Sequence, residues 1–515
     1  MPETPSRRKA WLRQAGLYLL LGLLFALTYT QSPLYTSNQN QYFLHGMARA
    51  GFGYLKQDWL ANTLDPTPLF SAIVYLTYRI THQPLLFYLY YAILLGVYLF
   101  CLIGIADFLF DLCKSKTRLG LFLGLVFLVH SAALRFALSR TLGENWTYIL
   151  EDGLADQRLL GPVFQPSAFG VLLVLSIYLF LKNKPILAVL AAALAATIHP
   201  TYLLGAAALT LAYMADSYRK EHRLSKILLI GATALLAVSP ILVYVYSSFA
   251  NTPPGPSAKA QEILVTYRIP FHAVVGRWFD LTAVVKILLV IWALWLIRKS
   301  RLFLILIIPT GIAFLLTVVQ VLTHSNTLAL LFPWRVSTFV VPLCVTLLLA
   351  ASVTGLFERY PNWNTPGKKW MLVVSALLIG LSTLIGGARL VLDFQRQAAD
   401  QDRAMMAFVG AHHSPDQYYL TPLDMQDFRL VTGSPVYVEF KSIPYQARDV
   451  LEWVRRIQNT DQFYKKADCA WIEKLHNIGL THVIATPKLY NLECSDWTAI
   501  YQDQHYGVYV LNQSP

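Results

Sequence analysis

Long apolar runs repeat along the first 388 residues of the chain, with polar segments between them. A helix that crosses a membrane needs about 20 mostly apolar residues. The runs predict eleven spanning helices, at residues 11–30, 84–109, 118–136, 163–181, 185–198, 200–215, 226–248, 281–297, 302–323, 331–356 and 369–388. The fifth and sixth runs are short and meet at His199-Pro200, so one broken hairpin is the alternative for that pair. The pattern predicts a polytopic α-helical membrane protein.

The pattern changes after residue 388. Apolar and polar residues alternate at 436–440, which is typical of a strand, and a helical stretch is expected at 449–457. Further strands are expected at 481–485 and 506–511. We therefore expect two domains, a small α/β domain at 389–515 and a transmembrane helical domain at 1–388. The outer loops of the helical domain are expected at 31–83, 137–162 and 249–280.

Composition supports the membrane assignment. Hydrophobic residues make up 56% of the 515 positions and charged residues only 14%, whereas soluble domains have about 25% charged residues. The basic excess lies in residues 1–388, which hold 30 Lys and Arg against 14 Asp and Glu, while residues 389–515 hold 12 against 15. Positive residues in short loops orient membrane proteins. A soluble enzyme, a fibrous protein and a nucleic-acid-binding domain are therefore excluded as the main interpretation.

The positive residues also predict the orientation. With the N-terminus in the cytoplasm, the short cytoplasmic segments hold 19 Lys and Arg, and the longer opposite segments hold 10. This places the long loops and the C-terminal domain outside the cytoplasm, in a protein of the inner or plasma membrane. On that oxidising side Cys469 and Cys494 can form a disulfide, and two free thiols are the alternative. The five cysteines show no CxxC spacing, so a metal cluster is not expected.

The first outer segment carries two acids, Asp58 and Asp65, among aromatic residues typical of a membrane surface. A partly desolvated carboxylate there can act as a general base, and Asp58 is the candidate catalytic residue. Asp65 is a candidate substrate-binding residue. The alternative for Asp58 is a helix cap, and for Asp65 it is the Asp-Pro turn.

Two further candidates lie in the next outer segments. Arg158 follows several acids and precedes a Pro- and Gly-rich helix start that suits a phosphate group. His199 stands at the break between two apolar runs, where an ionisable residue is a functional candidate. The alternatives are a solvated loop for the acids beside Arg158 and a hydrogen-bonded structural histidine for His199.

Cations gather near the start of the later spans. Arg268, His272 and Arg277 precede the eighth span, and Arg335 opens the tenth. Arginine forms a planar fork that matches phosphate oxygens, so these residues are candidates for binding a lipid phosphate. The alternative is ordinary headgroup contact in an aromatic belt. Lys286, inside the eighth span, is expected to snorkel toward the membrane surface.

The candidate residues share one membrane face under this topology. Acids and cations on an outer face, carried by loops long enough to fold, are typical of an active site that uses a lipid-phosphate substrate. The sequence resembles the GT-C superfamily of integral-membrane glycosyltransferases in its span pattern, its long first outer loop and its outer C-terminal domain. The resemblance is carried by residues 58–66, 268–272, 333–335 and 479–485. The C-terminal part, with Phe428-Arg429 and Glu452-Trp453, resembles an uncharacterised domain that closes such chains.

The resemblance implies transfer of a sugar from a polyprenyl-phosphate carrier to an extracytoplasmic acceptor in the cell envelope. Asp58 would accept the acceptor proton, and Arg268, His272 and Arg335 would stabilise the departing phosphate. Such enzymes commonly carry an acidic pair soon after the first span, whereas residues 37–42 here contain amides and no acid.

Other functions stay open from the sequence. A scaffold subunit of a membrane complex, with an unknown partner, would show the same spans, and so would a lipid or polysaccharide transporter. A transporter is expected to contain paired intramembrane ionisable residues and internal repeats, and the chain has few such residues and no repeat. The expected partners are a lipid-phosphate-linked sugar donor and membrane lipids, with no nucleic acid. No cofactor is identified, and the sparse outer acids give no support to a divalent metal.

Overall fold

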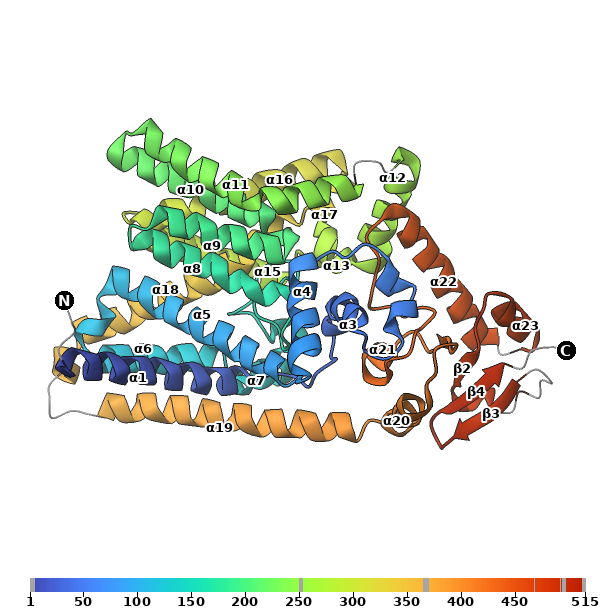
Figure 1. Ribbon diagram of the computed structural model, residues 1–515. Coiled ribbons are helices and arrows are strands. Elements are labelled where there is room, and N and C mark those ends of the chain that lie inside the picture. Colours follow the sequence, from blue (N-terminus) through green and yellow to red (C-terminus); the bar gives the residue numbers. More distant parts are fainter. Residues whose placement is uncertain are drawn as a thin grey trace. The chain divides into compact units, whose positions relative to one another are not determined.

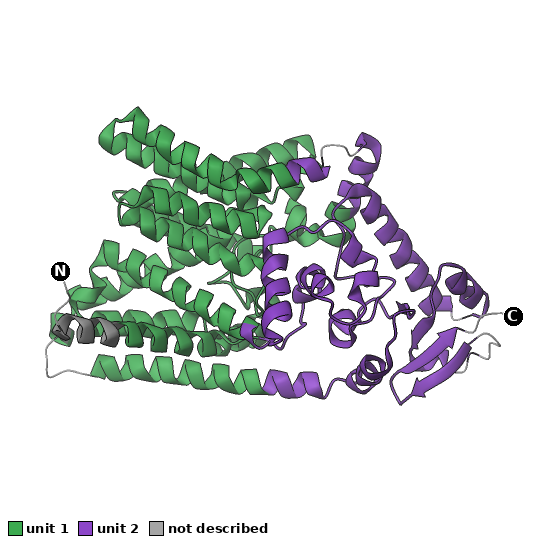
Figure 2. Ribbon diagram, viewed as in Figure 1, with its two compact units in different colours: residues 1–31, 87–244, 264–391 green, residues 32–86, 245–263, 392–515 purple. Residues whose placement is uncertain are grey.

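The computed structural model describes residues 5–249, 253–364, 370–466, 468–490, 492 and 497–511. Its contacts divide the chain into two compact units (Figure 2). Unit 1 contains Met1–Gln31, Phe87–Tyr244 and Leu264–Val391, and unit 2 contains Ser32–Leu86, Val245–Ile263 and Leu392–Pro515. The segment 32–86 is thus grouped with the C-terminal segment.

Unit 1 is a bundle of long apolar helices that run roughly alongside one another (Figure 1). The long helices are α1 (Pro5–Tyr29), α5 (Leu86–Phe110), α6 (Lys116–Val129), α7 (Ala132–Leu142), α8 (Val171–Leu181), α9 (Pro185–Ile198), α10 (Leu203–Glu221), α11 (Leu224–Phe249), α15 (Leu281–Leu296), α16 (Arg301–Thr323), α18 (Ser337–Arg359) and α19 (Trp370–Ala398). The short ones are η4 (Leu112–Lys114), η5 (Glu144–Trp146), η6 (Pro166–Gly170), η7 (Pro200–Tyr202), η8 (Leu264–Arg268), α13 (Pro270–Ala273), α14 (Val275–Trp278), α17 (Asn326–Leu330), η9 (Pro333–Val336) and η10 (Pro361–Asn364).

Each of the eleven predicted spans overlaps one of these helices. Within the described residues, five helical segments are long and apolar enough to cross a membrane: Leu86–Phe110, Leu224–Phe249, Arg301–Thr323, Asn326–Arg359 and Trp370–Ala398. Four shorter apolar helices accompany them. The chain is therefore an integral membrane protein of polytopic helical class, and the count of eleven crossings stays a prediction.

The predicted span at 118–136 is bent rather than one continuous helix. Helix α6 ends at Val129, and α7 starts at Ala132 with a bend of 53° between them. The hydroxyl of Ser131 accepts a hydrogen bond from Leu134 N (3.0 Å), so this serine caps a new helix. The preceding His130 is buried and contacts Tyr98 Oη through Nε2 at 3.2 Å.

Small residues permit close helix contacts in unit 1. A Cβ atom on Gly386 of α19 would lie 2.1 Å from the carbonyl oxygen of Leu27 in α1, so no side chain fits there. One helical turn away, the hydroxyls of Thr28 and Thr383 are 3.0 Å apart. Close backbone approach with a hydrogen bond across it is typical of helix pairs in membranes.

Unit 2 combines short helices with a small sheet. Its helices are α2 (Gln39–Tyr42), α3 (Leu44–Ala50), η1 (Leu55–Gln57), η2 (Leu60–Asn62), α4 (Pro68–Leu76), η3 (Thr77–Thr81), α12 (Pro254–Ile263), α20 (Arg403–His412), α21 (Phe428–Thr432), α22 (Ala447–Lys466), α23 (Ala470–Asn477) and η11 (Pro487–Leu489). The strands are β1 (Tyr419–Leu420), β2 (His482–Ala485), β3 (Trp497–Gln502) and β4 (Gly507–Leu511). They are ordered β1-β2-β4-β3, with only the β1–β2 pair parallel.

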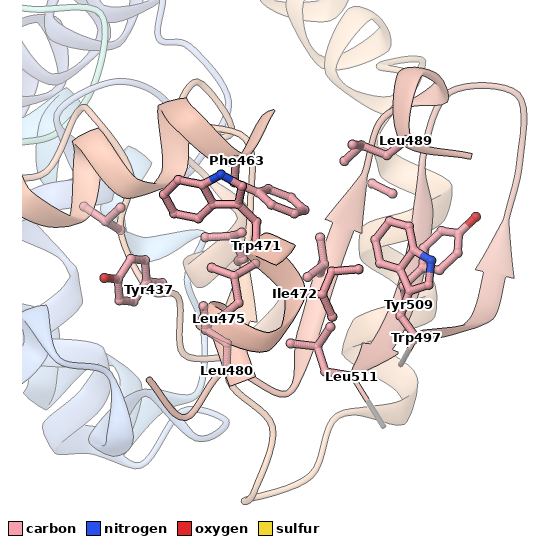
Figure 3. Packing of buried hydrophobic residues seen from close by; sticks show 14 of the residues in the cluster. Tyr437, Phe463, Trp471, Ile472, Leu475, Leu480, Leu489, Trp497, Tyr509 and Leu511 are labelled. Atoms are coloured by element: carbon pink, nitrogen blue, oxygen red, sulfur yellow. The ribbon is translucent and has the colours of Figure 1, made fainter. Parts of the chain in front are cut away.

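A large aromatic core holds the sheet against α22 and α23 (Figure 3). Phe463 and Trp471 of the two helices lie in this core, and the rings of Trp497 and Tyr509 stack with centroids 4.3 Å apart. Ile263 of α12 packs against the same core. The predicted small C-terminal α/β region is confirmed.

The predicted strand at 436–440 is wrong, although β2 and β4 match their predictions. Only Val436 forms a bridge, to Tyr419. The backbone N–H of Val436 donates to the carboxylate of Asp58 at 2.9 Å, so a side chain takes the N–H that a neighbouring strand could have used. Tyr437 N and Phe440 N donate to the backbone carbonyl oxygens of Tyr419 and Leu423, which are not on one paired strand.

Candidate active site

A cavity of about 530 Å³ lies in unit 1, between the loop that follows η5 and the segment from α13 to α15. Its apolar wall includes Leu154, Ala155, Phe271 and Trp278. Its charged lining consists of Glu144, Asp152, Asp156, Arg158, Arg277, Asp280 and Lys286. The lining is mainly polar, and polar groups that converge in a concave cavity are a feature of ligand sites.

The loop 151–157 is hydrogen-bonded to helices on both sides. The ammonium group of Lys286 in α15 donates to the carbonyl oxygen of Gly153 at 2.8 Å. On the other side, Leu154 N donates to the hydroxyl of Ser337 at the start of α18 at 2.7 Å. A Cβ atom on Gly153 would lie 2.4 Å from that hydroxyl oxygen, so glycine is required at this close approach. The loop is therefore rigidly placed in unit 1.

Asp152 is the buried acid of the cavity, with 2% of its surface exposed. Its Oδ2 lies 2.8 Å from Nε of Arg158, while its Oδ1 is buried without a hydrogen-bond partner among the described residues. Burial raises the pKa of Asp152 to about 7, although Arg158 and Lys286 act in the opposite direction. A carboxyl group with a pKa near neutrality is suited to take up and release a proton.

Arg158 is held from three sides. Besides Asp152, its Nη2 contacts Oδ1 of Asp156 at 3.0 Å, and its Cζ lies 3.8 Å from the ring centroid of Tyr148. Burial acts to lower the pKa of Arg158, but the neighbouring groups, Asp152 foremost among them, together outweigh it and the pKa is raised. The guanidinium group thus stays charged beside the cavity.

Two other predicted residues belong to the same place. Arg277 lines the cavity, and Nδ1 of His272 lies 2.6 Å from the carbonyl oxygen of Ala155 in the cavity wall.

The expectation that Lys286 snorkels is wrong. Its side chain is 7% exposed and lines the cavity, because the Gly153 carbonyl and the acid of Asp152 offer it partners that lipid does not.

His199 and Arg335 meet at Tyr202, also in unit 1. The rings of His199 and Tyr202 have centroids 5.4 Å apart, and Cζ of Arg335 lies 5.0 Å from the Tyr202 ring centroid. The Tyr202 hydroxyl donates to the carbonyl oxygen of Ser167 at 2.6 Å. Arg268 is buried at the end of η8. These residues lie in elements that flank the cavity segments in the chain, but they are not part of its lining.

Asp58 and Asp65 belong to unit 2. Asp58 is fully buried, and its Oδ2 accepts from Nε of Arg429 (2.7 Å) and from Val436 N (2.9 Å). Its Oδ1 accepts from Leu60 N (2.9 Å) and Ala61 N, which are the capping contacts of the alternative interpretation. Its role as a catalytic base stays a prediction.

Asp65 also has contacts typical of a structural turn. Its Oδ1 accepts from Thr67 N and from the Ser71 hydroxyl, both at 3.0 Å, and its Oδ2 lies 3.1 Å from Arg49. Asp58 belongs to one unit, and Arg158, His199, Arg268, His272 and Arg335 belong to the other, so the expectation that these six residues lie at one membrane face also stays a prediction.

The sequence interpretation did not select Asp152, Tyr148 or Lys286. The sequence did contain an indication that Lys286 is part of a site, because a lysine inside an apolar run needs a partner and the predicted outer loops contain few acids. The buried position of Asp152 has no local sequence signal, because it depends on contacts with α15 and α18.

In the part of the chain that the structure describes, no group of three or more His, Cys, Asp or Glu residues is arranged to hold a metal ion. Cys469 is disulfide-bonded. Its predicted partner, Cys494, lies outside the described residues.

Known proteins similar to this chain are found among family models and among solved structures. Residues 400–460 match a family model described as a domain of unknown function (DUF6798). The match includes Phe428-Arg429 and Glu452-Trp453, the pairs on which the resemblance to an uncharacterised domain is based. No curated protein matches the chain.

Among solved structures, the chain is similar to the crystal structure of ArnT from Cupriavidus metallidurans bound to undecaprenyl phosphate. The alignment covers 97% of this chain and 98% of that chain, with 12% sequence identity and a TM-score of 0.44. ArnT is a GT-C glycosyltransferase, the class that the sequence resembles. At this identity and TM-score the likeness assigns no role to any residue.

Proposed function

We propose that this protein transfers a sugar from a polyprenyl-phosphate carrier to the hydroxyl group of an extracytoplasmic acceptor, and that the cavity in unit 1 is the site of transfer. The observation that carries the proposal is the buried Asp152, which keeps one carboxylate oxygen without a hydrogen-bond partner among the described residues in a cavity also lined by Arg158, Arg277 and Lys286. A buried acceptor oxygen without a partner is costly, so it indicates a ligand or water contact.

Each group has a role in the proposed reaction. Asp152 Oδ1 accepts the proton of the acceptor hydroxyl, and the acceptor oxygen forms a bond to the anomeric carbon of the sugar. The bond from that carbon to the phosphate oxygen breaks, and the polyprenyl phosphate leaves with the bonding electrons. Arg158, Arg277 and Lys286 stabilise the negative charge that grows on this phosphate.

The surroundings of the cavity suit a lipid-linked donor. Phe271 lines the cavity and is exposed, and Phe279 and Leu281 expose large apolar side chains at the start of α15. Exposed apolar side chains beside a charged cavity give the polyprenyl chain a surface to contact while the phosphate reaches the cations. Arg268, His272 and Arg335 stay proposed as further phosphate-binding groups, and His199 as a substrate-binding one.

Asp152 and Asp58 are alternative bases, and a transfer assay separates them. Membranes containing the full-length protein are supplied with radiolabelled polyprenyl-phosphate sugars, and movement of label from the lipid to the water-soluble or glycan fraction is measured. Asp152→Asn is expected to reduce transfer about 100- to 10,000-fold, the usual contribution of a general base. Asp416→Asn, which changes an exposed acid in unit 2, is the matched control and should transfer like the wild type.

Three results are informative. Undiminished transfer by Asp152→Asn rejects Asp152 as the base, and loss of transfer in folded Asp58→Asn would return that role to Asp58. No transfer by the wild type with any donor, together with no binding of undecaprenyl phosphate, would reject the enzyme and favour the scaffold function.

A further inference from the structure

Tyr148 lies between two arginine–carboxylate pairs of unit 1. On one side Cζ of Arg158 lies 3.8 Å from the ring centroid, and on the other Cζ of Arg135 lies 5.5 Å from it. Arg158 pairs with Asp152 at 2.8 Å, and Arg135 pairs with Glu151 at 3.1 Å. The negative face of an aromatic ring attracts a guanidinium group, so one ring contacts both cations.

The backbone of Tyr148 also fixes both acids. Its carbonyl oxygen accepts from Glu151 N at 3.2 Å and from Asp152 N at 3.0 Å. The contacts are therefore closed on themselves: the ring of Tyr148 contacts both arginines, each arginine pairs with one acid, and the backbone of both acids is hydrogen-bonded to Tyr148. The side chains in this closed set of contacts are those of Asp152, Arg158, Tyr148, Arg135 and Glu151. Only part of this set reaches the cavity, because Tyr148, Asp152 and Arg158 line it whereas Arg135 and Glu151 do not.

This closed set of contacts fixes the position of the Arg158 side chain. Asp152 and Asp156 contact its Nε and Nη2, and the Tyr148 ring covers one face of the guanidinium group. Without the ring, the guanidinium group would have only the two carboxylates to fix it, and Asp156 is 54% exposed. A mobile Arg158 would hold Asp152 less well and would leave the phosphate side of the cavity less ordered.

We propose that Tyr148 is a positioning residue of this site: its ring holds Arg158 beside Asp152, so that one carboxylate oxygen is bound and the other is presented to the acceptor. This inference rests on the proposed use of Asp152 as the base. Tyr148 touches neither reacting group directly in the proposed reaction, and it acts through Arg158.

The test measures the protonation of Asp152 without any substrate. Infrared difference spectra across a pH series follow the protonated-carboxyl band that Asp152→Asn removes from the full-length protein. The charged groups around Asp152 are Glu151, Asp156, Arg158 and Lys286, and Glu144, Arg277 and Asp280 line the same cavity. All of them are unchanged in the variants at position 148.

The wild-type band is expected to titrate near pH 7. In Tyr148→Leu the weaker hold of Arg158 should move the midpoint upward by about one pH unit, since a nearby opposite charge shifts a carboxyl by about one to three units. Tyr148→Phe keeps the ring and should titrate like the wild type. If the leucine variant does not fold, Tyr148→Met has a more similar volume without the ring and carries the same expectation.

A wild-type midpoint in folded Tyr148→Leu or Tyr148→Met would overturn the inference, and so would an equal upward shift in Tyr148→Phe. The titration needs no transfer activity. Failure of the proposed function therefore appears in the transfer assay alone, and failure of the Tyr148 inference appears in the titration.

Discussion

Arg429 in unit 2 and Arg158 in unit 1 are each paired with an aspartate, but their surroundings differ. The Arg429 side chain is 3% exposed and contacts Asp58, Glu439 and the carbonyl oxygen of Val436. The Arg158 side chain is 30% exposed and lies beside a cavity. Every oxygen of the Asp58 and Glu439 carboxylates accepts a hydrogen bond, whereas Oδ1 of Asp152 has no partner among the described residues.

The comparison separates a structural ion pair from a candidate site. Burial acts to lower the pKa of Arg429, and Asp58 and Glu439 outweigh it, so the pKa is raised and the charge is kept. The acceptor oxygens of such a cluster already have hydrogen-bond partners, and the cluster joins the segment 32–86 to the segment that matches DUF6798 within unit 2. An unsatisfied carboxylate in a cavity has the opposite character, because a ligand can complete its hydrogen bonds.

The largest effect is expected from breaking the saturated cluster. Arg429→Met leaves Asp58 and Glu439 buried without their cation, which should cost about 3–5 kcal/mol of folding free energy. A loss of that size should lower the Tm of the full-length protein in detergent by about 10 °C. Arg448→Met is the matched control, because Arg448 is 86% exposed and a surface pair contributes about 1 kcal/mol or less. An unchanged Tm in Arg429→Met would contradict the structural role.

A smaller effect is expected from a cavity cation. Lys286→Met should weaken binding of undecaprenyl phosphate about 10- to 100-fold, the loss that corresponds to about 1.4–2.7 kcal/mol for a charged contact. Lys114→Met, at a lysine that is 74% exposed, should bind like the wild type. The measurement is titration of the lipid against purified protein by native mass spectrometry. Equal affinity for Lys286→Met and the wild type would remove Lys286 from the site.

The smallest effect is the pH dependence of transfer. Asp152 must be ionised to accept a proton, and its pKa is raised to about 7, so the transfer rate should rise with pH and reach half of its plateau near pH 7. At pH 6 about a tenth of the plateau rate should remain. A rate that is flat between pH 5 and 8 would be inconsistent with Asp152 as the base.

The raised pKa of Asp152 affects the stability of the fold in the opposite direction to the transfer rate, because stability falls as the pH rises. The folded protein binds the Asp152 proton more tightly than the unfolded chain, whose ordinary value is 3.8. The contribution of this group to the free energy of unfolding is therefore largest below about pH 4 and falls as the pH rises to about 7. Removing the group in Asp152→Asn should flatten this part of the stability profile.

The sequence predicted most of the fold, because helices in a membrane follow directly from runs of apolar residues. Each predicted span overlaps a helix, and β2 and β4 were expected at nearly the right residues. The errors occur where side chains accept hydrogen bonds from backbone N–H groups. Asp58 accepts from Val436 N in the segment predicted as a strand, and Ser131 caps a new helix inside a continuous apolar run.

The candidate site was predicted only in part. Arg158 and Arg277 were selected because arginines at an outer membrane face suit phosphate, and both line the cavity. Asp152 was missed because an acid in a polar loop looks solvated in the sequence, and only its position between α15 and α18 buries it. Asp58 was selected for its place after the first span, and two of its partners, Arg429 and Val436, lie more than 370 residues away in the chain.

A cryo-electron microscopy map of the protein in lipid nanodiscs with undecaprenyl phosphate tests the central claim most directly. The account predicts phosphate density in the unit 1 cavity, about 3 Å from the nitrogen atoms of Arg158, Arg277 or Lys286. An empty cavity, with the phosphate bound at a different group of cations, would contradict it.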